Sequence, residues 1–139
     1  MAKYNRFEDL ECYQLAIDIT KRFYILFQKK ELKNEYEFKA QLFAALVSIT
    51  NNISEGFEYN NNADFIRFLR YAKGSSGESR NILNVIKACG LITNDEYAPL
   101  YKDIILLSKQ IKGLKTYLEK FEAEKNKKPK GKKPKGENL

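Results

Sequence analysis

The segment LYKDIILLSKQIKGLKTYLEKF, residues 100–121, carries the most regular pattern in the chain. Its apolar residues recur at alternating steps of four and three, at Leu100, Ile104, Leu107, Ile111, Leu114, Leu118 and Phe121. Apolar residues repeated in this way form the seam along which one α-helix packs lengthwise against others. The segment therefore predicts a long helix in a helical bundle.

The start of this helix is open to two interpretations. Thr93 and Glu96 form a capping-box signature, which places the first helical turn directly after Thr93. Pro99 opposes this start, because proline removes a backbone donor from a helix. The helix therefore either begins near Ala98 or bends there.

Three further segments have helical periodicity, at residues 8–30, 36–59 and 63–89. A polar stretch at 29–35 and the run Asn60-Asn61-Asn62 separate them, and Asn61 or Asn62 can cap the helix that follows. Gly90 is expected to end the third helix. Because the turns are short, sequential helices should pack antiparallel. The sequence predicts an all-α protein with an antiparallel up-down-up-down four-helix bundle over residues 1–123 and a disordered tail over 124–139.

The third segment contains Gly74-Ser75-Ser76-Gly77 at its middle. This stretch is either a loop between two short helices or part of one helix, and we favour one helix because the apolar period continues across it. Each glycine inside a helix costs about 1 kcal/mol relative to alanine. Small residues here are expected to let a neighbouring backbone come close.

The net charge of +7 is concentrated at one end of the chain. Residues 125–139 hold seven lysines and one glutamate, a charge of +6, so the remaining residues carry +1. The tail is rich in Lys, Pro and Gly, which cannot build a core. A uniformly basic nucleic-acid-binding domain is therefore not what the sequence indicates.

Composition argues against an enzyme. The chain has no histidine, which removes His-based triads and the commonest metal ligand. Its two cysteines, Cys12 and Cys89, lie in no motif and are expected to be reduced core residues. Ser75 and Ser76 beside Lys73 are better explained by close helix packing than by a nucleophile pair. We expect no metal and no cofactor.

No targeting signal is visible. The opening MAKYNRFEDL lacks an apolar signal-peptide core, and no segment approaches the roughly 20 apolar residues of a membrane span. The expected location is cytoplasmic, with no membrane partner.

Two sets of residues are candidates for binding. Arg70, Lys73, Arg80 and Lys87 share one helical face through spacings of 3, 7 and 7, which suits either phosphate binding or simple solvation. The tail adds flexible cations at Lys127, Lys128, Lys130, Lys132, Lys133 and Lys135. A third set, Phe43, Phe57 and Tyr59, flanks the inward stripe of the second helix and is the candidate subunit interface.

Several motifs, in order and spacing, resemble one known family. They include Phe7-Glu8-Asp9-Leu10, Asn52-Ile53-Ser54-Glu55-Gly56, Phe65-Ile66-Arg67-Phe68-Leu69 and Ala72-Lys73-Gly74-Ser75. This pattern is similar to that of the four-helix-bundle proteins encoded in intervening sequences of bacterial 23S ribosomal RNA genes. The resemblance covers roughly residues 4–121 and implies an up-down bundle that assembles into a ring, typically a homopentamer.

The resemblance also suggests partners. A structurally similar protein, the accessory variability determinant of diversity-generating retroelements, is a pentamer whose basic surface binds nucleic acid and a reverse transcriptase. The expected function is therefore a non-enzymatic, oligomeric bundle that binds RNA or DNA through phosphate contacts or serves as an accessory scaffold. The alternative is a protein–protein scaffold without a nucleic-acid role.

Overall fold

A computed structural model describes the backbone of residues 4–132 and the side chains of residues 4–127. Within this part of the chain the fold is all α, with no strand. The elements are a 3-10 turn at Phe7–Asp9, α1 (Glu11–Leu26), a 3-10 turn at Lys30–Leu32, α2 (Tyr36–Glu58), α3 (Asn62–Ala88) and α4 (Asn94–Lys132). The prediction of four helices is confirmed, although the first helix is shorter than expected.

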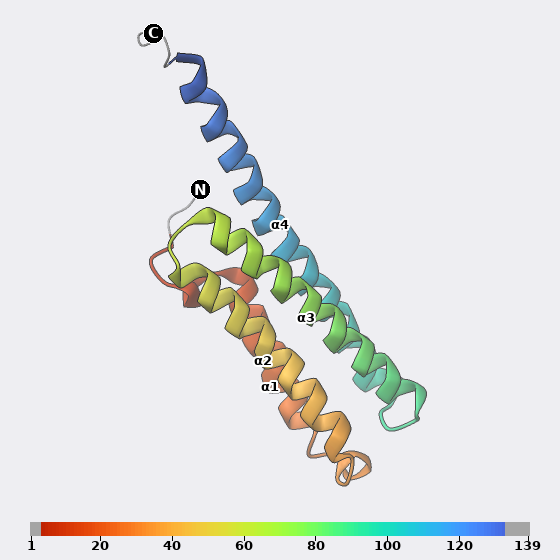
Figure 1. The fold of residues 1–139 in the computed structure, drawn as a ribbon. Helices are drawn as coiled ribbons and strands as arrows, with labels where there is room; N and C mark the ends of the chain where they lie inside the picture. The colour runs from red at the N-terminus through yellow and green to blue at the C-terminus, as the bar shows by residue number, and fades with distance from the viewer. Residues whose placement is uncertain (1–3, 133–139) are drawn as a thin grey trace.

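The helices form an antiparallel bundle in which each runs opposite to the one before it (Figure 1). Helix α1 contacts α2 and α4, and α3 contacts the same two helices from the other side. This arrangement closes the four helices around one shared core and agrees with the predicted up-down-up-down topology.

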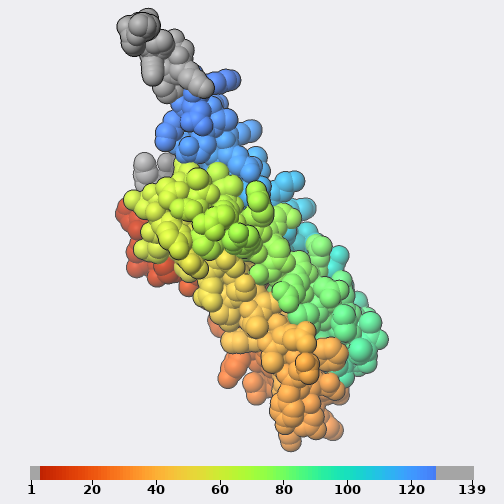
Figure 2. Space-filling view, in the orientation of Figure 1, coloured from red at the N-terminus to blue at the C-terminus, as the bar shows by residue number. Residues whose placement is uncertain are grey.

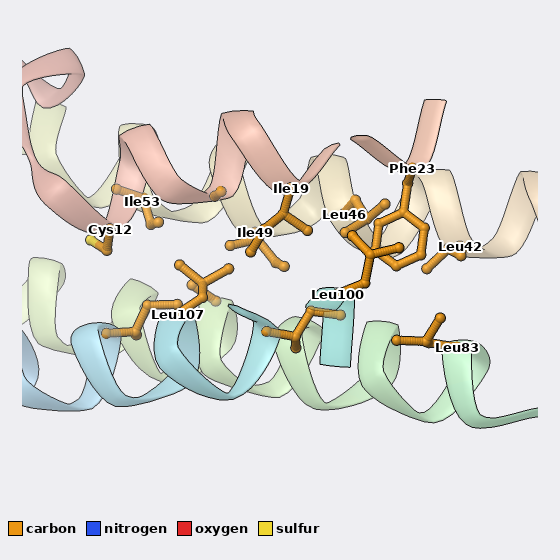
Figure 3. Packing of buried hydrophobic residues seen from close by; sticks show 14 of the residues in the cluster. Cys12, Ile19, Phe23, Leu42, Leu46, Ile49, Ile53, Leu83, Leu100 and Leu107 are labelled. Atoms are coloured by element: carbon orange, nitrogen blue, oxygen red, sulfur yellow. The ribbon is translucent and has the colours of Figure 1, made fainter. Parts of the chain in front are cut away.

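The core receives apolar side chains from all four helices. Ile19 of α1, Ile49 and Ile53 of α2, Leu83 of α3 and Leu107 of α4 are fully buried and converge on the bundle axis (Figure 3). Along α4 the predicted seam is buried from Leu100 to Leu118, except that Leu114 is only partly covered. Phe121, the last predicted member, is 47% exposed.

Not every apolar residue of the bundle lies in the core. On α1 the residues that face inward are Cys12, Ala16, Ile19 and Phe23, whereas Ile17 and Tyr24 are exposed. The expectation that both cysteines belong to the core holds for one of them: Cys12 is buried and Cys89 is exposed. Cys89 is exposed because it follows the last residue of α3, beyond its final core contact. Burial raises the pKa of the Cys12 thiol to about 11, so this thiol stays protonated at neutral pH.

The helix ends follow local capping rules. The Asn61 side chain accepts a hydrogen bond from the Asp64 backbone N–H at 2.8 Å and caps α3. Gly90 has a φ of +76°, and the backbone N–H of Leu91 donates to the Ile86 carbonyl, as in a Schellman motif.

The start of α4 is settled by its capping box. The Glu96 backbone N–H donates to the Thr93 hydroxyl, and the Thr93 backbone N–H donates to the Glu96 carboxylate. This reciprocal pair is the capping box that the sequence predicts. The helix therefore begins at Asn94 and continues through Pro99, so the later start near Ala98 is wrong.

Helix α3 is continuous through the Gly-Ser-Ser-Gly segment, as favoured from the sequence. The expected reason for the small residues is wrong in part. A Cβ atom at Gly74 or Gly77 would meet nothing within 4 Å, because both glycines face outward. The buried small residues are Ser76 and Ser79, whose hydroxyls donate to carbonyls of their own helix.

Helix α4 continues beyond the bundle. The backbone is helical to Lys132, so the predicted boundary at residues 123 and 124 falls inside the helix (Figures 1 and 2). Lys, Glu and Ala are good helix formers, and extending an existing helix avoids the cost of nucleation. The ion pairs Lys115–Glu119 and Glu122–Lys125 support this stretch. Residues 133–139, the end of the predicted tail, lie outside the described residues.

Candidate nucleic-acid interface

One flank of α3 faces α4 and carries three of the predicted cations. At the two ends of this flank, the Asn62 amide donates to Glu122 and Asn84 accepts from the Tyr97 hydroxyl, each at 2.7 Å. Lys73 and Arg80 lie between these two contacts. Lys73 follows Asn62 by 11 residues and Arg80 follows Lys73 by 7, and both spacings return to the same side of a helix. Lys87 follows seven residues later. We call Lys73, Arg80 and Lys87 the α3 row; all three are partly exposed.

Arg70 lies apart from this row. It is exposed, and its position three residues before Lys73 places it about 60° around the helix axis. The structure thus groups three of the four cations predicted on α3 beside α4 and turns the fourth toward solvent.

Helix α4 contributes a second set of cations that the sequence analysis missed. Lys102, Lys109 and Lys120 recur at intervals of 7 and 11 residues and share the outer face of α4. Lys112, three residues after Lys109, lies between this face and α3. We call these four lysines the α4 row; all four are exposed. Their spacing is visible in the sequence, on the same helix that carries the apolar seam.

The cations of both rows lack acidic partners. None of the seven takes part in an ion pair within the described residues. Three acidic residues of α4 are engaged by other groups: Asp103 pairs with Arg22 at 2.7 Å, Glu119 pairs with Lys115 at 3.1 Å, and Glu122 accepts from Asn62. The two rows therefore present uncompensated positive charge to solvent.

Charge is distributed unevenly between the two halves of the bundle. Residues 4–60, which form α1 and α2, hold 7 basic and 9 acidic residues, a net charge of −2. Residues 61–127, which form α3 and α4, hold 12 basic and 8 acidic residues, a net charge of +4. The near-neutral body expected from the sequence is in fact one acidic and one basic half.

Two tyrosines at the start of α4, Tyr97 and Tyr101, are engaged with their neighbours. Tyr97 and Tyr101 stack with ring centroids 5.3 Å apart. The Lys87 ammonium group lies 5.6 Å from the centroid of the Tyr97 ring, in a cation–π contact. With its hydroxyl bonded to Asn84, Tyr97 serves to fix the end of α4 against α3.

The tail cations are only partly described. Lys127 is exposed on the projecting part of α4. The side chains of Lys128, Lys130 and Lys132 lie outside the described part of the chain, as do residues Lys133 and Lys135 entirely.

The three residues predicted at a subunit interface fall into two groups. Phe43 and Tyr59 are exposed. Phe57 is half-buried, because its ring packs between Phe7 and Phe65 of the same chain. Phe43 belongs to a shallow apolar groove of about 330 Å³ between α1 and α2, lined by Tyr24, Phe27, Gln28, Lys39, Ala40 and Phe43.

The serines near the middle of α3 serve packing. The Ser75 and Ser48 hydroxyls share a hydrogen bond of 2.8 Å between α3 and α2, and the Asn52 amide donates to Ser48. Among the described residues, no group of three His, Cys, Asp or Glu side chains is placed to hold a metal ion. Over the same part of the chain, no helix is both long and apolar enough to cross a membrane.

Comparison with known proteins agrees with this architecture. A solved structure of a protein of unknown function from the S23 ribosomal protein family of Bacteroides thetaiotaomicron superposes with a TM-score of 0.67. The two sequences are 23% identical, and the match covers 76% of this chain and 95% of that one, which supports the fold. No curated protein matches the chain significantly. The model of the family described as 23S rRNA-intervening sequence protein matches residues 8–113. The chain therefore belongs to the 23S rRNA-intervening sequence protein family.

Proposed function

We propose that this protein is a non-enzymatic nucleic-acid-binding module that contacts phosphates through the α3 and α4 rows. The single observation that carries the proposal is the set of seven cations without acidic partners on one half of the bundle. A cation held in an ion pair must give up its carboxylate partner before it can contact a phosphate. Within the described residues, none of these seven side chains has an ion-pair partner to lose.

The charge asymmetry supports the same proposal. The acidic half repels a polyanion and the basic half attracts it, so an approaching nucleic acid is oriented toward α3 and α4. Because lysine and arginine contact phosphates without reading bases, such binding is independent of sequence. The lysines beyond residue 124 would add further attraction close to the end of α4.

The binding experiment compares three proteins. In the site variant, Lys73→Gln, Arg80→Gln and Lys112→Gln remove three charges from the two rows. In the control variant, Lys21→Gln, Lys30→Gln and Lys33→Gln remove three exposed charges from the α1–α2 half, where no ion pair is lost. Lys87 is left intact because it packs on Tyr97.

Fluorescence anisotropy with a labelled RNA would measure the dissociation constant at about 100 mM salt, where non-specific binders still bind at roughly micromolar levels. We expect the site variant to bind at least about tenfold more weakly than the parent, and the control variant to bind like the parent. Equal affinity of the two variants would contradict the proposal, because net charge alone would then explain binding.

A second candidate function is a protein-interaction scaffold, and one observation favours it. The groove between α1 and α2 exposes the Tyr24 and Phe43 rings, whose centroids lie 6.4 Å apart. An exposed apolar groove of this kind suits a protein partner. The two functions are compatible if the bundle is an accessory subunit of a ribonucleoprotein or retroelement-type complex, holding nucleic acid on one half and a protein such as a reverse transcriptase on the other. If the parent does not bind nucleic acid in the anisotropy experiment, the scaffold function alone remains.

A further inference from the structure

We infer that the nucleic acid bound by the α3 and α4 rows is double-stranded and is held by its two phosphate backbones. This inference rests on the proposed function and specifies the class of its ligand. Two features support it: the cations lie in two lines, and the rings of Tyr97 and Tyr101 are already in contact with neighbouring side chains.

The cations form two lines and not one. The α3 row extends over 14 residues of helix, about 21 Å, and the α4 row over 18 residues, about 27 Å. Both lines lie on regular helices that pack side by side, which fixes them about 8–10 Å apart at the helix axes. Two rigid lines of positive charge suit the two lines of phosphates that border a groove of a duplex.

Rigidity also favours a rigid ligand. The contacts Asn62–Glu122, Tyr97–Asn84 and Lys87–Tyr97 join α3 to α4 at both ends of the α3 row. The backbones that carry the rows therefore keep a fixed spacing. This spacing suits a partner whose two lines of phosphates are themselves held at a fixed separation.

Single-strand binding normally needs aromatic rings on which bases can stack. The tyrosines on this surface do not offer them. Tyr97 has Tyr101 stacked beside it and Lys87 over its ring, and Tyr101 is half-buried against the core. Unpaired bases therefore find no free ring face at Tyr97 or Tyr101, whereas the phosphates of a duplex can still contact the cations of both rows.

The test uses full-length protein with three probes of matched length: an RNA duplex and a DNA duplex of about 16 base pairs, and an unstructured oligouridine of 16 nucleotides. We expect both duplexes to bind at least about tenfold more tightly than oligouridine at the same salt concentration. The site variant should lose this preference. Tyr101→Leu, which removes the ring and keeps an apolar side chain, should bind all three probes like the parent.

Two results would overturn the inference. One is oligouridine binding as tightly as the duplexes, and the other is a loss of affinity in Tyr101→Leu with helicity retained by circular dichroism. In either case the proposed function survives, because nucleic acid is still bound through the same surface. If none of the three probes binds to the parent, both the inference and the proposed function fail.

Discussion

Gly56 of α2 lies directly against Phe68 of α3: a Cβ atom built on Gly56 would stand 2.7 Å from the Phe68 Cβ and 3.1 Å from the Phe65 ring. Unbonded carbon atoms do not approach so closely, so no other residue fits at this position without moving α3. Together with the Ser48–Ser75 hydrogen bond, this contact sets the spacing between the two helices.

The contact predicts opposite effects for two glycine substitutions. Gly56→Ala should reduce the free energy of unfolding by about 1–3 kcal/mol, the usual cost of overpacking. Gly74→Ala is the matched control, since it adds the same methyl group to a helix with nothing within 4 Å. It should stabilise the protein by up to about 1 kcal/mol through helix propensity. Urea unfolding measures both, and a stabilising Gly56→Ala would show that the helices are not in contact as described.

A second prediction concerns the seam of α4. Leu107 and Ile111 are fully buried at its centre. Leu107→Asp or Ile111→Asp would place an unpaired carboxylate among apolar side chains, at a cost of several kcal/mol against a total stability of about 5–15 kcal/mol. Both variants should lose their cooperative thermal transition in circular dichroism. Phe121→Asp is the control, because Phe121 is exposed on the same helix. This variant should melt like the parent.

A third prediction follows from the pKa of Glu96. The Lys29 ammonium group at 2.8 Å and the Thr93 backbone N–H both favour its carboxylate and hold the pKa of Glu96 below its usual value. A lowered folded-state pKa stabilises the protein above the unfolded-state value, near 4.5, and the effect disappears as the pH falls through the folded-state pKa. Glu96→Gln retains a capping side chain but loses the charge.

The melting temperature of Glu96→Gln should therefore lie below that of the parent at pH 7. The difference should narrow when both proteins are melted at about pH 3, because protonation then begins to remove the charge from Glu96 in the parent as well. A gap of equal size at both pH values would mean that the charge on Glu96 does not stabilise the fold.

Much of this fold follows from the sequence because local rules and tertiary packing agree. The apolar period of residues 100–121, the Thr93–Glu96 capping box and Gly90 each predicted the observed element. Sequence spacing is insufficient where a neighbouring helix decides whether a residue is buried. Tyr24 continues an apolar stripe but faces solvent, and Gly56 is indistinguishable in sequence from the exposed Gly74.

The candidate site was predictable to a smaller extent. Helical spacing was sufficient to group Lys73, Arg80 and Lys87, because residues seven apart share one side of a helix. It could not show that α4 lies on that side with lysines of its own. Which carboxylates are neutralised also depends on contacts between distant segments, such as Arg22 with Asp103.

A fourth prediction concerns self-association, which the resemblance to ring-forming bundles leads us to expect. Tyr24 and Phe43 expose 59% and 39% of their surfaces on the α1–α2 half, and Tyr59 is exposed at the end of α2. Light scattering at micromolar concentration should give the mass of five 16.2-kDa chains. Phe43→Ser and Tyr59→Ser together should reduce that mass. A clean monomer for the parent would contradict the expectation.

The measurement that tests the central claim most directly is the salt dependence of binding to duplex DNA, made with the parent, the site variant and a chain without residues 125–139. Each phosphate contact adds about 0.9 to the slope of log K against log salt concentration. We predict that the site variant and the truncated chain each have a shallower slope than the parent, and that the truncated chain retains a measurable slope of its own. If the site variant keeps the full slope of the parent while truncation abolishes it, the binding site is the terminal segment and not the surface formed by α3 and α4.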